Sequence, residues 1–99
     1  MGVMRGVLDG AVEVAVVVAV RPDGIVRPVA LLATPGIAEE VEIGDGPSDG
    51  IRRGRIGDDP IDVLVAPAEP NTVRPLAVLT TPWIAEHLAL YARRLWRSR

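Results

Sequence analysis

The residues of this chain that could carry acid–base or nucleophilic chemistry are few and lie far apart in the sequence. His87 is the single histidine, cysteine is absent, and the serines are Ser48 and Ser98. A catalytic triad needs a nucleophile, a base and an orienting group, and a zinc site needs three or four ligands. Neither set is present in the sequence, which therefore predicts a non-enzymatic protein without a cofactor or a metal ion. His87 is expected to be a solvated helix residue.

Two short segments resemble ligand-binding loops only in composition. Asp58, Asp59 and Asp62 could supply oxygen ligands to Mg²⁺ or Ca²⁺, but their spacing does not match an EF-hand. The Gly-Asp-Gly-Pro-Ser-Asp-Gly run at 44–50 lacks the lysine of a phosphate-binding P-loop and the strand-to-helix setting of a dinucleotide fingerprint. We interpret both segments as turns and loops.

Arginines form the strongest candidate for binding a charged partner. If the segment 52–55 folds near the C-terminal helix, their guanidinium groups could bind the phosphates of a nucleic acid or another polyanion. The chain as a whole is acidic, with a net charge of −2 and a pI near 5.3, and no aromatic residue is interleaved with the arginines of the segment 52–55 to stack on bases. We therefore favour pairing of these arginines with acidic residues, within one chain or between copies, and nucleic-acid binding is the alternative. The candidate residues are Arg52, Arg53, Arg55, Arg93, Arg94 and Arg97.

An internal repeat organises the elements that must position these residues. Residues 26–41 recur at 73–88, an offset of 47, with ten of sixteen positions identical. In the wider repeat unit two apolar segments precede a Thr-Pro helix start, where Thr is the N-cap and Pro the first helical residue. The two segments are joined by a tight turn in the first unit and by a six-residue connection, Pro67–Thr72, in the second. The repeat predicts an α+β fold: a duplicated ββα–ββα unit, with a mostly antiparallel sheet and two helices on one face.

The repeat also sets the expected organisation of the single domain, residues 1–99. Unit one covers about 11–43, unit two covers about 61–97, and a connector rich in Gly, Asp and Arg, expected as a long loop or linker, covers 44–60. The tight turn at Arg21–Gly24 predicts a β-hairpin in unit one. The first helix is expected from Pro35 to about Glu42, ended by Gly44, and the second from Pro82 to about Arg97.

The sequence contains more apolar residues than one sheet and one layer of helices can bury. This excess predicts self-association. The even positions of the segment 11–20 form one apolar face, and its odd, Ala-lined face is apolar as well. Trp83 replaces Gly36 of the first repeat, and the second helix has a wider apolar face than an amphipathic helix needs. The leading prediction is a self-associating protein-interaction or structural module, with a dimer favoured and a different protein partner possible. The candidate interface residues are Ala15, Val17, Ala19, Trp83, Leu90 and Trp96.

The sequence also bears on a small-molecule site and on the location of the protein. A third function, binding of a small molecule or minor catalysis in a cleft between the repeats, would use His87, Glu86 and Asp62. The longest apolar run, Val14–Val20, is too short to cross a membrane, and Asp9 and Glu13 interrupt any secretory signal pattern. A soluble protein of the cytoplasm, without a membrane partner, is therefore expected.

Overall fold

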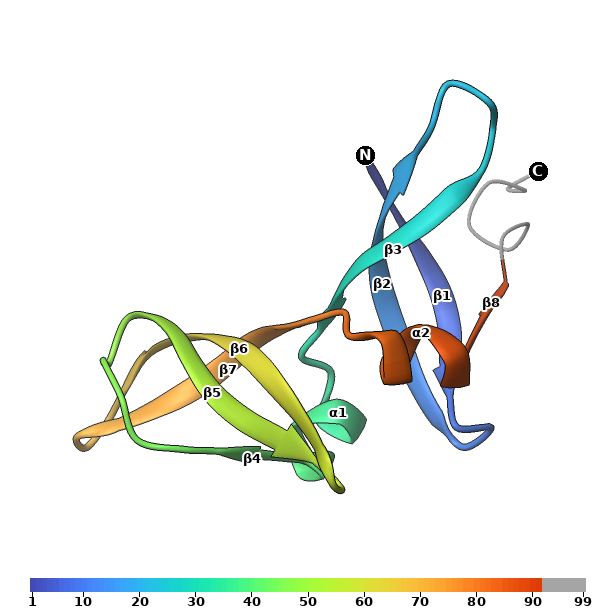
Figure 1. The fold of residues 1–99 in the computed structure, drawn as a ribbon. Helices are drawn as coiled ribbons and strands as arrows, with labels where there is room; N and C mark the ends of the chain where they lie inside the picture. Colours follow the sequence, from blue (N-terminus) through green and yellow to red (C-terminus); the bar gives the residue numbers. More distant parts are fainter. Residues whose placement is uncertain (92–99) are drawn as a thin grey trace.

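The computed structural model describes residues 1–91, and strands dominate this part of the chain (Figure 1). Within it, eight strands and two short helices follow one another in the sequence. Their bounds are β1 Gly2–Leu8, β2 Val12–Val20, β3 Val26–Leu32, α1 Pro35–Glu40, β4 Val41–Ile43, β5 Gly50–Ile56, β6 Asp59–Ala68, β7 Thr72–Leu79, α2 Pro82–His87 and β8 Leu88–Tyr91.

The predicted α+β class is wrong. Strands hold 60% of the described residues and helices 13%, so the protein is a curled antiparallel sheet with two helical turns. The helices do not form a layer over one face of the sheet; they lie between two curved lobes, one made of β1, β2, β3 and β8 and the other of β4 to β7 (Figure 1). Neither described helix is long and apolar enough to cross a membrane.

The sheet has a palindromic strand order in which the two halves of the chain exchange their last strands. The order is β4-β5-β6-β7-β3-β2-β1-β8. The unit that recurs is therefore strand–strand–strand–helix–strand, and not the predicted ββα. Strand β4, from the first unit, completes the lobe of the second unit by pairing with β5, and β8 completes the lobe of the first by pairing with β1.

The strand registers relate the two units residue by residue. Gly2 pairs with Val18 and Gly50 with Val65, so β1 corresponds to β5 at an offset of 48, and β2 corresponds to β6 at an offset of 47. The offset changes from 48 to 47 because the loop of the β1–β2 hairpin is one residue longer than the loop of the β5–β6 hairpin. At the centre, Leu31 of β3 pairs with its own equivalent, Val78 of β7, which places an approximate twofold axis between these strands.

The core lies on one face of the sheet and repeats with the strands. Leu31, Val78 and the helix residues Ile37 and Ile84 are fully buried. Paired residues of neighbouring antiparallel strands lie on the same face, so the register defines a row of side chains across the sheet. From β1 to β5 this core row is Met4, Val16, Leu31, Val78, Val63 and Arg52.

Short local signals start the helices, and pairing with distant strands ends them. The Oγ1 atoms of Thr34 and Thr81 accept hydrogen bonds from the amides of Ile37 and Ile84, so the predicted N-caps are confirmed. Both helices have only six residues. The second was expected to reach Arg97, but Leu88 begins strand β8, because the alternation in Leu88-Ala89-Leu90 also fits a strand and β1 offers a free edge.

The predicted connector is also wrong over most of its length. Residues 50–56 form β5, and β6 begins at Asp59, so only 44–49 form a connecting loop. The composition indicated a loop because Gly and Asp are depleted in strands, but cross-strand pairing overrides that weak preference. The hairpin expected at Arg21–Gly24 is confirmed by the β2–β3 pairing and by a hydrogen bond from the Arg21 amide to the Ile25 carbonyl.

Candidate interaction surface

The face of the sheet opposite to the core carries apolar side chains that follow the same cross-strand register. One row crosses β1, β2, β3 and β7, and each of its residues is the cross-strand partner of the next: Val3, Val17, Ala30 and Leu79. Their counterparts in the other unit form a second row across β5, β6, β7 and β3. We call the two rows together the outer stripe: Val3, Val17, Ala30, Leu79, Ile51, Leu64, Ala77 and Leu32.

The outer stripe exposes large side chains to solvent at four positions. Val3 is 44% exposed, Ile51 47%, Leu64 37% and Leu79 38%. The two alanines at the centre, Ala30 and Ala77, are buried. Isolated exposed aliphatic residues are common on proteins, but several that lie on one face of a sheet make that face a candidate interaction surface.

Charged residues border the outer stripe on the same face. Arg53 of β5 lies opposite Asp62 of β6, one step along the strands from Ile51 and Leu64, and the Nε and Oδ1 atoms are 3.2 Å apart. One step further, Arg55 donates a hydrogen bond of 2.8 Å to Glu42 of β4. This contact raises the pKa of Arg55 above its usual value, first through the hydrogen bond and then through the charge of Glu42. An apolar centre with a polar rim is the usual anatomy of a protein interface.

The predicted interface residues divide between this surface and other places. Ala15, Val17 and Ala19 all lie on the outer face of β2 and are half-buried, and Val17 belongs to the outer stripe. Trp83 and Leu90 pack partly against the core instead. Trp96 lies outside the described residues. Whether any of these residues forms an interface stays a prediction.

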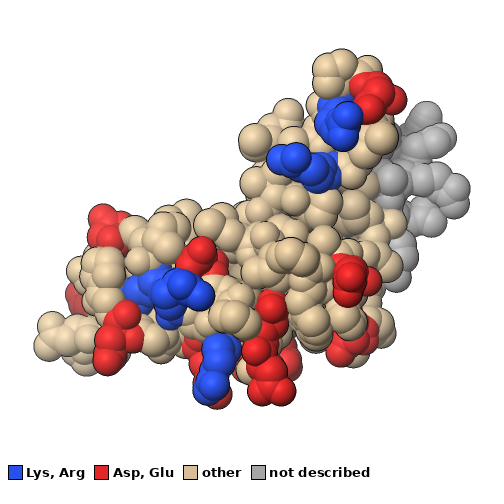
Figure 2. All heavy atoms as spheres, in the orientation of Figure 1, with Lys and Arg blue, Asp and Glu red and all other residues tan. Residues whose placement is uncertain are grey.

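The predicted arginine cluster does not form a free cationic patch in the described part of the chain. Arg52 donates hydrogen bonds to the carbonyls of Gly44, Gly46 and Pro47 and so holds the 44–49 loop. Arg53 and Arg55 are paired with acidic residues. Figure 2 shows basic and acidic side chains side by side over the lobe of β4 to β7. Arg93, Arg94 and Arg97 lie outside the described residues.

The residues proposed for a cleft between the repeats do not meet at one site. His87 stacks on Trp83, with ring centroids 4.1 Å apart, and its Nδ1 lies 2.8 Å from the Trp83 carbonyl oxygen. Asp62 pairs with Arg53 on the outer face, and Glu86 is exposed on α2. His87 is half-buried, so the expectation of a solvated histidine is wrong.

The acidic residues of the β5–β6 hairpin have a structural role. Asp59 accepts a hydrogen bond of 2.7 Å from the Thr81 hydroxyl and thereby ties the start of α2 to the hairpin. Among residues 1–91, no three His, Cys, Asp or Glu side chains are close enough to hold a metal ion.

Comparisons with protein-family models, curated proteins and solved structures found no match.

Sequence reasoning missed Val3, Ile51, Leu64 and Leu79 as surface residues. One signal was present: Leu64 is the equivalent of Val17 at the 47-residue offset, and Val17 is a predicted interface residue. The pairing of β3 with β7, which joins the two rows into one patch, has no local signal in the sequence because the strands are about half the chain apart.

Proposed function

We propose that this protein is a non-enzymatic module that self-associates through the outer stripe. The observation that carries the proposal is the cross-strand register of the stripe, which aligns four exposed aliphatic side chains on six strands with approximate twofold symmetry. Removal of exposed Val, Leu and Ile side chains from water is the main driving force for such association. The second copy is the favoured occupant because an isologous dimer uses the same patch on both partners, and a symmetric patch can pair with itself.

Two sheets that pack face to face bury their aliphatic side chains in a layer between them. The charged pairs around the stripe would then lie at the rim, where they stay solvated and favour one relative orientation. Strand edges are a less suitable alternative, because β4 has three residues and β8 has four within the described residues 1–91.

Sedimentation equilibrium of the wild-type chain and of Leu64→Glu tests this proposal. The carboxylate would be desolvated within the interface, so the dimer dissociation constant should rise at least about tenfold. Val20→Glu is the matched control, since Val20 is 59% exposed at the end of β2 and outside the stripe. A wild-type chain that stays monomeric at all concentrations, or a Leu64→Glu variant that dimerises like the wild type, would contradict the proposal.

Binding of nucleic acid or another polyanion is the second candidate from the sequence. The contacts of Arg52, Arg53 and Arg55 weigh against it, because these guanidinium groups already have partners. The same sedimentation runs with a short DNA duplex at low salt compare the two candidates. If DNA increases the sedimenting mass of the wild type and this increase disappears when the three arginines become alanine, the polyanion hypothesis is favoured. We retain the cytoplasm as the proposed location.

A further inference from the structure

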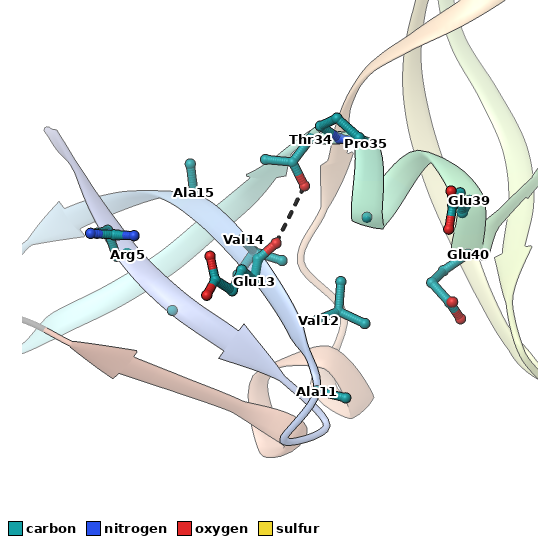
Figure 3. Close-up of a pocket in the computed structure, with 12 residues that line it drawn as sticks. Arg5, Ala11, Val12, Glu13, Val14, Ala15, Thr34, Pro35, Glu39 and Glu40 are labelled. Carbon is teal, nitrogen blue, oxygen red and sulfur yellow. Dashed lines mark hydrogen bonds between the residues drawn. The ribbon is translucent and has the colours of Figure 1, made fainter.

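One groove sets the first unit apart from the second. It has a volume of about 660 Å³ and lies between the β1–β2 hairpin and the start of α1 (Figure 3). Arg5 and Glu13 border it on the side of the sheet, and Glu39 and Glu40 border it on the side of the helix. The Thr34 hydroxyl donates a hydrogen bond of 3.3 Å to the Glu13 carbonyl and fixes the helix beside the hairpin. This volume lies within the range of small-molecule sites.

The corresponding place in the second unit holds an aromatic side chain. Trp83 is the equivalent of Gly36, and together with Asp58 and Asp59 of the β5–β6 hairpin it lines a smaller cavity of about 270 Å³. The His87 ring stacks on the indole with an interplanar angle of 19°. The fold therefore accommodates a planar ring at this position, and the first unit lacks one because it has Gly36 and Glu40 instead.

The charges of the groove determine what kind of ring it would take. Its lining has three carboxylates, those of Glu13, Glu39 and Glu40, and one guanidinium, that of Arg5. These carboxylates do not form a metal-binding group among the described residues. Arg53 in the second unit is paired with Asp62, whereas Arg5 lies opposite Ala15, so both ends of the groove present charge to a ligand. The excess of carboxylates favours an organic cation.

We propose that the groove beside Gly36 binds a small planar aromatic amine, with the ring in the place that Trp83 occupies in the second unit and the ammonium group facing Glu39 and Glu40. The ring would bury its faces between α1 and the hairpin, and an exposed carboxylate would pair with the amine.

Tryptamine is the probe for this site, with 3-ethylindole as its neutral analogue and 3-indolepropionate as its anionic analogue. In a titration of ¹⁵N-labelled protein, tryptamine is expected to shift the amide signals of Gly6, Ala15 and Gly36. 3-Ethylindole should bind more weakly, and 3-indolepropionate should bind most weakly of the three. Equal binding of all three probes, or shifts confined to other parts of the chain, would overturn the proposal.

Gly36→Trp combined with Glu40→His copies the second unit into the first. A Cβ at Gly36 would meet the Val12 Cγ1 methyl at 3.1 Å, which a small movement of that side chain relieves. The variant should fill the groove and lose the tryptamine shifts. Glu40→Gln, an exposed and nearly isosteric change, covers the case of a misfolded double variant, and it should raise the tryptamine dissociation constant about threefold or more. Unchanged tryptamine binding by both variants would refute the site.

Discussion

The two halves of this chain agree at most interior positions, with buried Met4 opposite in kind to its equivalent Arg52, and they differ at the surface beside their helices. Val16 and Val63, Ile37 and Ile84, and Leu31 and Val78 are equivalent pairs, and all six residues are fully buried. Around α1 and α2 the equivalents are Gly36 and Trp83, Glu40 and His87, and Ala15 and Asp62. Packing therefore constrains these core positions in the same way in both halves. Positions beside the helices differ, so that the first half has an open groove beside α1 and the second has a smaller cavity beside α2.

The largest expected effects concern the core that the halves share. Ile37→Ala and Ile84→Ala should each lower the free energy of unfolding by about 2–5 kcal/mol, because each removes a fully buried side chain and leaves a cavity. Urea unfolding measures both. The exposed Val20→Ala serves as the control and should cost no more than about 0.5 kcal/mol. If the losses of unfolding free energy in the two variants differ by more than about 2 kcal/mol, the two halves do not contribute equally to the core.

The next effects test the exchanged strands. A Cβ at Gly54 would lie 2.2 Å from the Glu42 carbonyl oxygen of β4, and one at Gly6 would lie 2.8 Å from the Ala89 carbonyl oxygen of β8. Both atoms are backbone, so the strands must shift, and we expect Gly54→Ala to cost about 1–3 kcal/mol and Gly6→Ala less.

Hydrogen exchange locates the damage from these glycine substitutions. Amides of β4 should lose protection in Gly54→Ala, and those of β8 should do so in Gly6→Ala. Wild-type protection of both edge strands in both variants would argue against the strand exchange.

The smallest effects concern the helix starts. Thr81→Ala should cost about 1 kcal/mol or somewhat more, and Thr34→Ala should cost less. Thr81 donates to the Asp59 carboxylate at 2.7 Å, whereas Thr34 donates to a neutral carbonyl at 3.3 Å. Thermal unfolding of the single variants and of Thr81→Ala in an Asp59→Ala background measures the difference. If the cost of Thr81→Ala is the same in both backgrounds, the contact with Asp59 is not its source.

Local chemistry in the sequence determined where the main elements begin. The Thr-Pro pairs start both helices because the hydroxyl caps an amide and proline needs no partner there. The apolar alternation around Val16 and Val63 marks buried strand faces, and the Pro-Asp-Gly turn makes a hairpin. These signals act between neighbouring residues, so a sequence contains them in full.

Only the tertiary structure decided how the halves combine. The segment after His87 fits a helix and a strand equally well, and the open edge of β1 selects the strand. The pairing of β3 with β7 joins two rows of aliphatic residues into the outer stripe, and the position of α1 beside the hairpin turns the missing side chain of Gly36 into a groove. The physical reason is that strand pairing and cavity shape depend on atoms that are distant in the chain, and local preferences of about 1 kcal/mol are too weak to determine them.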